Sequence, residues 1–404
     1  MGKKGDGTLA WLRERNRERV IDVLREQGRT SQADIARVTG LSRTTVSKLV
    51  TELKGSGLVG ELDVSAPDPR GAHGGRPPVQ LALRDSSNAV VGIDFGHSHV
   101  QVAVADLARN VLAERLRALD VSHNAIDALD TSVVMIDEVL AEAGVRRASI
   151  IGAGIGIPGP VDRVRGTVGS STILPGWVGL RIGAEMTERL GLPVEIENDA
   201  NMGALAELTW GAGRDCSNFA YIKASTGIGA GIVIDGKLLR GASGTAGEIG
   251  HTTLNDGGAL CYCGNRGCLE TVASGPAIVG LVGNGHGENL TLGAVIDLAS
   301  KGDVRCRRAI SDAGREIGIA VAGMCNLINP ERVIIGGLLS RAGDLVLDPI
   351  RESVRRYAVQ AAAERVQVVR AVFVERAELL GSLALALSAT KPSIHQMGSA
   401  IHSS

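Results

Sequence analysis

The sequence predicts an α/β protein in two parts: an α+β front domain over residues 1–84 and a larger α/β body over residues 85–390. A chain of 404 residues is too long for one ordinary core, so more than one domain is expected. Closely spaced helix caps mark the front domain. Two glycine-rich hairpin turns, over a hundred residues apart, indicate that the body is a duplicated fold. Residues 391–404 are polar, and we expect a flexible tail there.

Cap residues and apolar spacing in the front domain predict three helices in a helix-turn-helix arrangement, followed by two strands. The first helix carries Val20, Ile21 and Leu24 and ends at Gly28; the second runs from Ser31 to Thr39; Gly40 makes the turn; the third runs from Ser42 to about Lys54. Residues 58–62 and 79–83 read as strands, and a loop rich in proline and glycine joins them. This pair predicts the wing of a winged helix-turn-helix.

The outer face of the third helix carries short polar and basic side chains near its N-terminus, which is the end that enters the major groove of DNA in such domains. Residues 1–84 hold 15 Lys and Arg against 10 Asp and Glu, although the whole chain has a net charge of −1. An arginine in the wing loop suits the minor groove. The candidate DNA contacts are Arg43, Thr44, Thr45, Ser47, Lys48 and Arg76. The alternative is a plain three-helix bundle with a polar surface and an inert linker.

One histidine and three cysteines have the composition of a metal site: His251, Cys261, Cys263 and Cys268. One imidazole and three thiolates form a closed tetrahedral structural zinc site. Glu248 and Glu270 flank the cluster, so a metal there would direct carboxylates toward a polyhydroxylated ligand. The alternatives are a chance grouping and a disulfide, although a Cys-x-Cys pair is poorly placed to bridge itself.

The glycine-rich turns of the body are candidate phosphate-binding turns, because glycine lets backbone N–H groups approach phosphate oxygens. One turn follows a strand at 89–95, a second follows a strand at 219–223, and paired glycines follow a third strand near 333–335. The candidate residues are Asp94, Gly96 and Ser98 in the first turn, Thr226, Gly227 and Gly229 in the second, and Gly336 and Gly337, which suit packing against an adenosine.

A carboxylate and an amide, Asp199 and Asn198, follow the strand predicted at 193–196 and open a helix. A carboxylate in this position can orient a sugar hydroxyl and accept its proton during phosphoryl transfer. The alternative is that Asn198 or Asp199 only caps the helix.

Together and in this order, the motifs resemble those of the ROK family of bacterial sugar kinases and sugar-responsive repressors, which have the two-lobed actin-like ATPase fold, a duplicated ribonuclease-H-like fold. The resemblance covers nearly the whole chain. It rests on Asp94-x-Gly96, Gly156-x-Pro158-Gly159, the run from Glu197 to Asn201, the run from Ser225 to Gly229, Glu248-Ile-Gly-His251 and the cysteine run that ends at Glu270. The front domain with Gly-Gly-Arg-Pro-Pro resembles the transcriptional-regulator branch, which includes glucose, xylose and N-acetylglucosamine regulators.

The resemblance implies roles for individual residues. Asp199 would be the catalytic base of a kinase or a sugar contact of a regulator; Asn198, Glu248, His251 and Glu270 would bind sugar hydroxyls; His251 would also ligate the zinc with Cys261, Cys263 and Cys268. The family's first phosphate turn reads Asp-x-Gly-Gly-Thr, whereas here His97 and Ser98 stand in place of the second glycine and the threonine. This departure argues against ATP and Mg²⁺ at that turn and leaves the sugar residues intact.

We therefore expect a sugar-responsive transcriptional regulator, a repressor in sign, that binds operator DNA and a monosaccharide or sugar phosphate effector as a homodimer or homotetramer. The alternative is an active ATP-dependent hexose kinase, similar to a glucokinase, with an accessory DNA-binding domain. The sequence has no apolar stretch of membrane-spanning length and its start lacks the apolar segment of a signal peptide, so we expect a cytoplasmic protein without a membrane partner.

Overall fold

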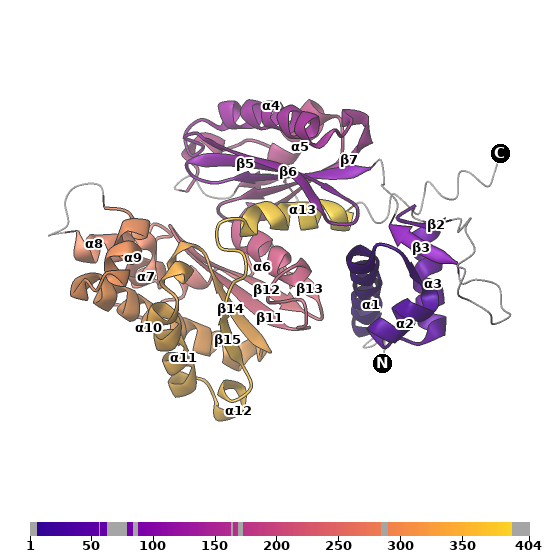
Figure 1. Ribbon diagram of the computed structural model, residues 1–404. Helices are drawn as coiled ribbons and strands as arrows, with labels where there is room; N and C mark the ends of the chain where they lie inside the picture. The colour runs from indigo at the N-terminus through magenta and orange to yellow at the C-terminus, as the bar shows by residue number, and fades with distance from the viewer. Residues whose placement is uncertain are drawn as a thin grey trace.

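The computed structural model describes residues 6–55, 57–62, 79–83, 88–162, 165–168, 173–283 and 290–389 (Figure 1). The front domain contains α1 (Asp6–Gln27), β1 (Thr30–Ser31), α2 (Gln32–Thr39), α3 (Arg43–Gly55), β2 (Val59–Leu62) and β3 (Gln80–Leu83). The first half of the body contains β4 (Ala89–Phe95), β5 (His99–Asp106), β6 (Val111–Ala118), α4 (Ala125–Ala143), β7 (Ile150–Ile157), β8 (Val161–Asp162), β9 (Thr167–Val168), α5 (Ile182–Leu190), β10 (Val194–Asn198) and α6 (Asp199–Thr209). The second half contains β11 (Phe219–Ala224), β12 (Ile228–Ile234), β13 (Lys237–Leu239), α7 (Glu270–Ala273), α8 (Gly275–Val282), α9 (Leu292–Ser300), α10 (Val304–Ile328), β14 (Arg332–Gly336), α11 (Asp344–Tyr357), α12 (Gln360–Ala363), β15 (Gln367–Arg370) and α13 (Ala377–Ala389). Among the described helices, none is long and apolar enough to cross a membrane.

The front domain has the predicted helices and wing strands. The Ser31 hydroxyl accepts a hydrogen bond from the Asp34 backbone N–H at 3.2 Å, as the capping-box pattern predicts. Gly40, with φ of 68°, ends α2 in the left-handed conformation that glycine adopts at low cost. The sequence did not reveal β1, which pairs with β3 in a sheet of order β1-β3-β2. The wing loop that carries Arg76 and the tail at 391–404 lie outside the described residues.

The body has the duplicated topology that the paired turns predict. In each half an antiparallel meander is extended on one side by two parallel strands, which gives the spatial orders β6-β5-β4-β7-β10 and β13-β12-β11-β14-β15. The turn after β4 in the first sheet therefore corresponds to the turn after β11 in the second. We call the two sheets with their covering helices the first lobe and the second lobe.

The two corresponding helices α6 and α13, which follow the last strand of each sheet, pack against each other between the lobes (Figure 1). Their close approach depends on residues without a side chain. A Cβ atom on Gly381 of α13 would lie 2.0 Å from the Met202 carbonyl oxygen of α6, and one on Gly154 of β7 would lie 2.0 Å from the Ser382 carbonyl oxygen. The glycines therefore set the depth to which α13 enters the junction.

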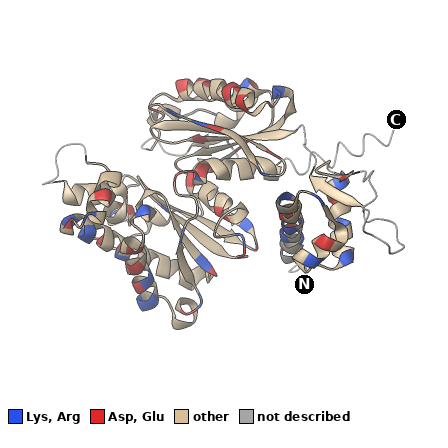
Figure 2. Cartoon of the chain, in the orientation of Figure 1, with Lys and Arg blue, Asp and Glu red and all other residues tan. Residues whose placement is uncertain are grey.

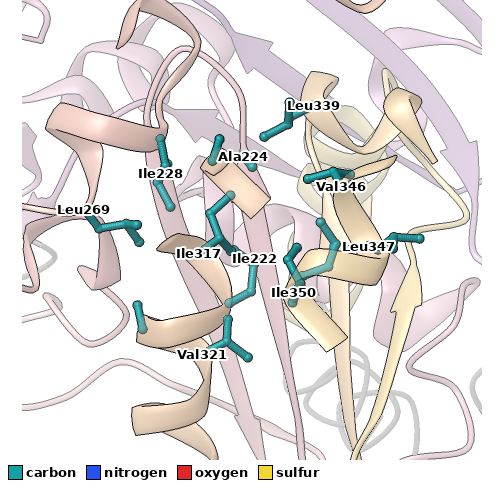
Figure 3. Packing of buried hydrophobic residues seen from close by; sticks show 14 of the residues in the cluster. Ile222, Ala224, Ile228, Leu269, Ile317, Val321, Leu339, Val346, Leu347 and Ile350 are labelled. Atoms are coloured by element: carbon teal, nitrogen blue, oxygen red, sulfur yellow. The ribbon is translucent and has the colours of Figure 1, made fainter. Parts of the chain in front are cut away.

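The second lobe buries its largest apolar cluster between its sheet and the helices α10 and α11 (Figure 3). Alternate residues of β11 point to opposite faces of the sheet. Ile222 and Ala224 contribute to this cluster, whereas Phe219 and Tyr221 pack on the opposite face, where α6 lies. β11 is thus buried on both sides, and its residues are held firmly where it meets the junction between the lobes.

Gly381→Ala should destabilise the protein, because the new methyl group must displace the α6 backbone. Overpacking of this kind costs about 1–3 kcal/mol in the free energy of unfolding. Gly323→Ala is a matched control in α10, where an added Cβ atom meets nothing within 4 Å. That change should be stabilising by about 0.5–1 kcal/mol, because alanine is the better helix former. Denaturant unfolding of both variants measures the difference, and equal stability of Gly381→Ala and wild type would mean that the helices are not in close contact.

Candidate functional site

A cleft of about 700 Å³ lies between the two halves of the body. The turn after β4 contributes residues 96–99, and the turn after β11 contributes residues 225–229. Asn198 and Asp199 reach it from the start of α6, and Glu248, His251 and Glu270 line another part of its wall. The structure thus brings the predicted sugar-binding residues and most of the predicted phosphate-turn residues, Gly96, Ser98, Thr226, Gly227 and Gly229, into one cleft.

A half-buried lysine joins two carboxylates inside the cleft. The Lys223 ammonium at the end of β11 donates to Asp199 Oδ2 at 2.8 Å and lies 2.7 Å from Glu378 Oε1. Burial by itself lowers the pKa of Lys223, but the two carboxylates outweigh it and hold this pKa well above its ordinary value. Burial raises the pKa of Glu378, and Lys223 opposes that shift. The ammonium therefore holds together the first turns of α6 and α13.

Two imidazoles crowd the first turn. His99 Nε2 lies 3.2 Å from Asp94 Oδ2, and this hydrogen bond raises the pKa of His99. A Cβ atom on Gly96 would lie 2.2 Å from the His99 ring, so the ring covers the glycine on that side. His97 lines the cleft, its Nδ1 is 3.1 Å from the Ser122 hydroxyl, and burial lowers its pKa. Both imidazoles, and not His97 alone, thus lie at the turn where the family's pattern has a second glycine.

Asn198 has the capping role that was the alternative for this segment. Its Oδ1 accepts from the backbone N–H groups of Ala200 at 2.9 Å and Asn201 at 3.3 Å, at the N-terminus of α6. Its Nδ2 donates to the Gly159 carbonyl oxygen at 2.9 Å. The cap fixes the adjacent Asp199, whose Oδ1 accepts from the Ala200 N–H at 2.8 Å and whose Oδ2 is bound to Lys223.

Glu248 and Glu270 extend the row of acceptors along the cleft. Burial raises the pKa of Glu248, and the nearby His251 opposes this. Glu270 Oε2 accepts from the Ile228 backbone N–H at 3.3 Å. Since Ile228 belongs to the second glycine-rich turn, Glu270 ties the segment after the cysteines to that turn.

The four predicted metal ligands meet in one cluster. Their ligand atoms lie within 4.8 Å of one another, with 3.6 Å between His251 Nδ1 and Cys261 Sγ and 3.7 Å between the sulfurs of Cys263 and Cys268. A tetrahedral zinc with Zn–S bonds of about 2.3 Å separates its ligand atoms by about 3.8 Å. All six cysteines are free, so the disulfide alternative is wrong. The donor set and its spacing fit zinc.

The second nitrogen of His251 faces away from this cluster. His251 Nε2 lies 3.2 Å from the Tyr262 hydroxyl and 3.9 Å from Glu248 Oε2. If Nδ1 binds a metal, Nε2 carries the hydrogen and is a donor toward the cleft. The His251 imidazole can in this way bind a metal through Nδ1 and donate a hydrogen bond to a sugar through Nε2, the two roles that the sequence analysis gave it.

Some predicted residues lie outside the walls of the cleft. Asp94 is connected to the cleft through its hydrogen bond to His99, which lines it. Gly336 and Gly337 are not among the cleft residues, and a Cβ atom on Gly336 would lie 2.2 Å from the Tyr221 hydroxyl oxygen. Glycine at 336 is thus explained by packing on Tyr221, and its contact with an adenosine stays a prediction.

The outer face of α3 is largely free within the described residues. Arg43, Thr44, Ser47 and Lys48 are exposed, and Figure 2 shows basic residues on this part of the front domain. Thr45 is half-buried, with its hydroxyl 2.8 Å from that of Ser42, so it also serves the helix cap.

Sequence reasoning missed His99, Lys223, Glu378 and Tyr262. A lysine within the apolar strand Phe-Ala-Tyr-Ile-Lys-Ala and a glutamate at the head of an apolar helix are signals that point to a buried ion pair. The identity of the partners depends on the lobe arrangement, which these signals do not contain.

Comparisons with known proteins agree with this geometry. Residues 90–389 match the ROK family, and residues 13–59 match winged helix-turn-helix DNA-binding domains. The chain belongs to the ROK family. A xylose repressor from Caldicellulosiruptor bescii is 32% identical over 397 residues, which are 95% of this chain and 98% of the repressor.

Two solved ROK structures are similar to this ROK chain. A ROK transcriptional regulator, a homologue of the Escherichia coli Mlc protein, superimposes with a TM-score of 0.74 at 28% identity and covers 96% of this chain and 99% of its own. A ROK glucokinase from Streptomyces griseus, in complex with glucose and AMPPNP, has a TM-score of 0.65 at 31% identity and covers 74% of this chain and 100% of its own. The glucokinase therefore matches a smaller share of the chain than the regulator does.

Lys223→Met should destabilise this ROK protein, because it leaves two carboxylates in the cleft without their cation. Removing one partner of a buried ion pair costs up to about 5 kcal/mol, and partial exposure of the cleft reduces this to roughly 2–4 kcal/mol. The loss should shrink at acid pH, because burial raises the pKa of Glu378 and its protonation removes the unpaired charge.

The double variant Lys223→Met with Glu378→Gln is the matched control, since it removes a cation and an anion together. It should be more stable than Lys223→Met alone in denaturant unfolding at pH 7. A double variant less stable than the single one would contradict the ion-pair account.

Proposed function

We propose that this ROK chain is a sugar-responsive transcriptional regulator, a repressor in sign, in which the front domain binds operator DNA and the cleft binds a monosaccharide or sugar phosphate. The observation that carries this proposal is the presence of both parts in one chain: an exposed polar face on α3 and a cleft lined with carboxylates. The alignment with a xylose repressor over 95% of the chain supports it, because that alignment includes both parts.

The proposed sugar contacts are Asn198, Asp199, Glu248, His251 and Glu270. Adjacent hydroxyls of a sugar ring need acceptors at fixed positions, and carboxylates accept such hydrogen bonds strongly. Glu270 is held by the Ile228 N–H and Asp199 by Lys223, so both are in place before a sugar arrives. His251 Nε2–H would donate to the same ligand.

Zinc is the metal we propose for His251, Cys261, Cys263 and Cys268. A zinc ion there would supply structural cross-linking and no open coordination position. Binding of the ion would fix the tautomer of His251. It would also fix the position of Glu270, which lies two residues after the ligand Cys268. The site would thereby connect folding of the cysteine loop to the placement of a sugar acceptor.

For DNA we propose that Arg43, Thr44, Ser47 and Lys48 contact bases and phosphates in the major groove, with Thr45 at the helix start and Arg76 in a flanking minor groove. One recognition helix reads only a few base pairs, so we propose a homodimer or a dimer of dimers on a palindromic operator. We also propose domain limits at 1–84 and 85–390.

Kinase activity is the second candidate function, because Asp199 is retained and the chain resembles a glucokinase that binds glucose and AMPPNP. Two features weigh against turnover. Asp199 Oδ2 is already bound to the Lys223 ammonium, the His99 ring lies against Gly96 in the first turn, and His97 lines the cleft there. We therefore propose that sugar binding is the principal property and phosphoryl transfer is weak or absent.

One zinc per chain should be found by elemental analysis of the purified protein. Cys263→Ala removes the exposed ligand and should lower the zinc content severalfold and weaken sugar binding, because the loop before Glu270 loses its cross-link. Cys325→Ala is the control, since this cysteine is buried in α10 away from the cluster, and it should keep its zinc. Zinc-free wild-type protein with full sugar affinity would sink the proposal.

A screen of sugars and sugar phosphates by thermal shift, and of DNA duplexes selected from a random library, tests the function itself. A bound sugar should raise Tm, and it should change the affinity for the selected duplex. Glu270→Gln should weaken sugar binding by about tenfold, a loss of roughly 1.4 kcal/mol, as expected for a charge-assisted hydrogen bond. Asp256→Asn, on the exposed part of the cysteine loop, should bind normally.

The same samples with ATP and Mg²⁺ distinguish the two candidate functions. Rapid, sugar-dependent release of ADP that Asp199→Asn abolishes would favour the kinase. Sugar affinity that is equal with and without the duplex would remove the regulator, because linkage requires the effect to be reciprocal.

A further inference from the structure

One face of α1 contacts the body, and its residues divide between the two lobes. Glu14, Glu18 and Asp22 follow one another at intervals of four, and Arg15 lies seven residues before Asp22. These spacings place all four on one side of the helix, with the glutamates toward one edge and Arg15 and Asp22 toward the other. Figure 2 shows charges of both signs along α1. The apolar side of the helix, with Val20 and Leu24, faces the core of the front domain.

The glutamate edge contacts the first lobe, at the turn between β5 and β6. The Arg109 guanidinium donates to Glu18 at 2.8 Å and lies 3.9 Å from Glu14. Only 15% of the Arg109 side chain and 22% of that of Glu18 are exposed. Arg109 has φ of 69°, a conformation that glycine or asparagine adopts more easily. The contact of the Arg109 side chain with α1 accounts for the presence of arginine at this position.

Apolar contacts strengthen the attachment to the first lobe. Ala108 in the same turn is buried in the core of the front domain, and Leu107 packs against both that core and the cluster between the first sheet and α13. The turn is stiffened by Asn110, whose side chain donates to Asp106 at 2.8 Å. The front domain is therefore firmly seated on the first lobe.

The other edge of α1 contacts the second lobe, at the loop between α6 and β11. Arg214 forms an ion pair with Asp22, and Arg15 donates to Asp215 at 3.1 Å. These pairs are more exposed: the Arg214 and Asp215 side chains expose 43% and 81%. The loop moves with the second sheet, because Glu331, next to β14, accepts from the Ser217 and Asn218 N–H groups at 2.7 and 2.9 Å.

From this geometry we propose that α1 bridges the two lobes outside the cleft and reports their relative orientation to the DNA-binding surface. The inference rests on the proposed function, which makes the cleft between the lobes a sugar site. A sugar that draws the lobes together changes the distance between the Arg109 turn and the Arg214 loop. A straight helix bound to both cannot follow that change, so one set of contacts must break.

The contacts with the second lobe break first, because exposed ion pairs are weak and the attachment to the first lobe includes buried apolar groups. The front domain then moves with the first lobe, and the direction in which α3 points changes relative to the second lobe. The two pairs at the Arg214 loop hold the arrangement seen in this structure. Sugar binding has to overcome them, which lowers its apparent affinity.

The test compares the full-length wild type with variants of the ion pairs at each end of the bridge. Arg214→Ala with Asp215→Ala frees the second-lobe end. Arg109→Asn removes the ion pairs at the first-lobe end, keeps a residue that tolerates positive φ and leaves the apolar contacts of Ala108 and Leu107 in place. None of these residues lines the cleft. D-xylose and D-glucose are the probes, measured by calorimetry without DNA and again with the selected duplex.

Without DNA, the sugar that binds wild type should bind the variant with Arg214→Ala and Asp215→Ala about 2- to 10-fold more tightly, as expected when two exposed ion pairs no longer resist closure. Arg109→Asn should bind it like wild type, because the apolar contacts still hold the first-lobe end. Combining the variants should give no further gain, because freeing one end already removes the bridge. The effect of sugar on duplex affinity should fall toward none in the variants that carry Arg214→Ala and Asp215→Ala. Higher salt should tighten sugar binding to wild type and leave the variant with Arg214→Ala and Asp215→Ala unchanged, because exposed pairs are screened.

Arg13→Ala is the matched control, because Arg13 lies on α1 but pairs with Glu52 inside the front domain. It should behave as wild type. Asp22→Arg and Arg214→Asp should each alter the sugar affinity when made alone. Made together, they exchange the two charges of the ion pair and should restore the wild-type sugar affinity. Two outcomes overturn the bridge while the proposed function stands. One is unaltered sugar affinity and coupling in the variant with Arg214→Ala and Asp215→Ala, and the other is a further gain in sugar affinity when Arg109→Asn is added to it. A wild type that binds the duplex but none of the sugars and sugar phosphates of the thermal-shift screen overturns both.

Discussion

The site depends on the crossing of α6 and α13 between the two lobes. Each helix follows the last strand of its sheet, so the duplication places their first turns in corresponding positions. Asp199 begins α6 and Glu378 lies in the first turn of α13, and the crossing brings both to Lys223. α13 can approach α6 this closely only because Gly381 has no side chain, and it can lie this close to β7 only because Gly154 has none. The packing of the helices thus brings two carboxylates together, and a cation is required between them because both are largely removed from water.

The cation has a consequence for chemistry. A carboxylate that acts as a general base must present a lone pair to the hydroxyl that it deprotonates. Here one oxygen of Asp199 accepts from the Ala200 N–H and the other is bound to the ammonium, while the Asn198 cap fixes the backbone. Such a group is well suited to recognise a hydroxyl in a fixed position. The hydrogen bonds that hold the Asp199 carboxylate in place for binding also make its oxygens less available to accept a proton.

The sequence predicts the parts of the fold that depend on local rules. Caps at Ser31 and Gly40, alternation in the strands and the paired glycine-rich turns lead to the correct element types and to the duplicated body. The Cys3His cluster is also predictable, because its spacing alone brings the ligands within one loop. Contacts between residues far apart in the sequence could not be predicted. The Lys223–Glu378 pair, for example, joins residues that are 155 positions apart. The strand β1 has two residues and leaves almost no pattern, and the reason for glycine at 336 is a tyrosine on a neighbouring strand.

The strength of the contacts between the front domain and each lobe can be compared with the free energy that a sugar can supply. A sugar can shift a conformational equilibrium only by its difference in affinity for the two states, and coupling free energies between sites are typically about 1–3 kcal/mol. A front domain buried by large apolar surfaces against both lobes would exceed this, and no sugar would release it. Exposed ion pairs contribute about 0.2–1 kcal/mol each. The pairs of Arg15 with Asp215 and of Asp22 with Arg214 are therefore of the right strength to be broken by a small ligand. The buried turn at Ala108 keeps the domain attached while they break. Strong attachment to one lobe and weak attachment to the other is the arrangement that converts lobe closure into a movement of the DNA-binding surface.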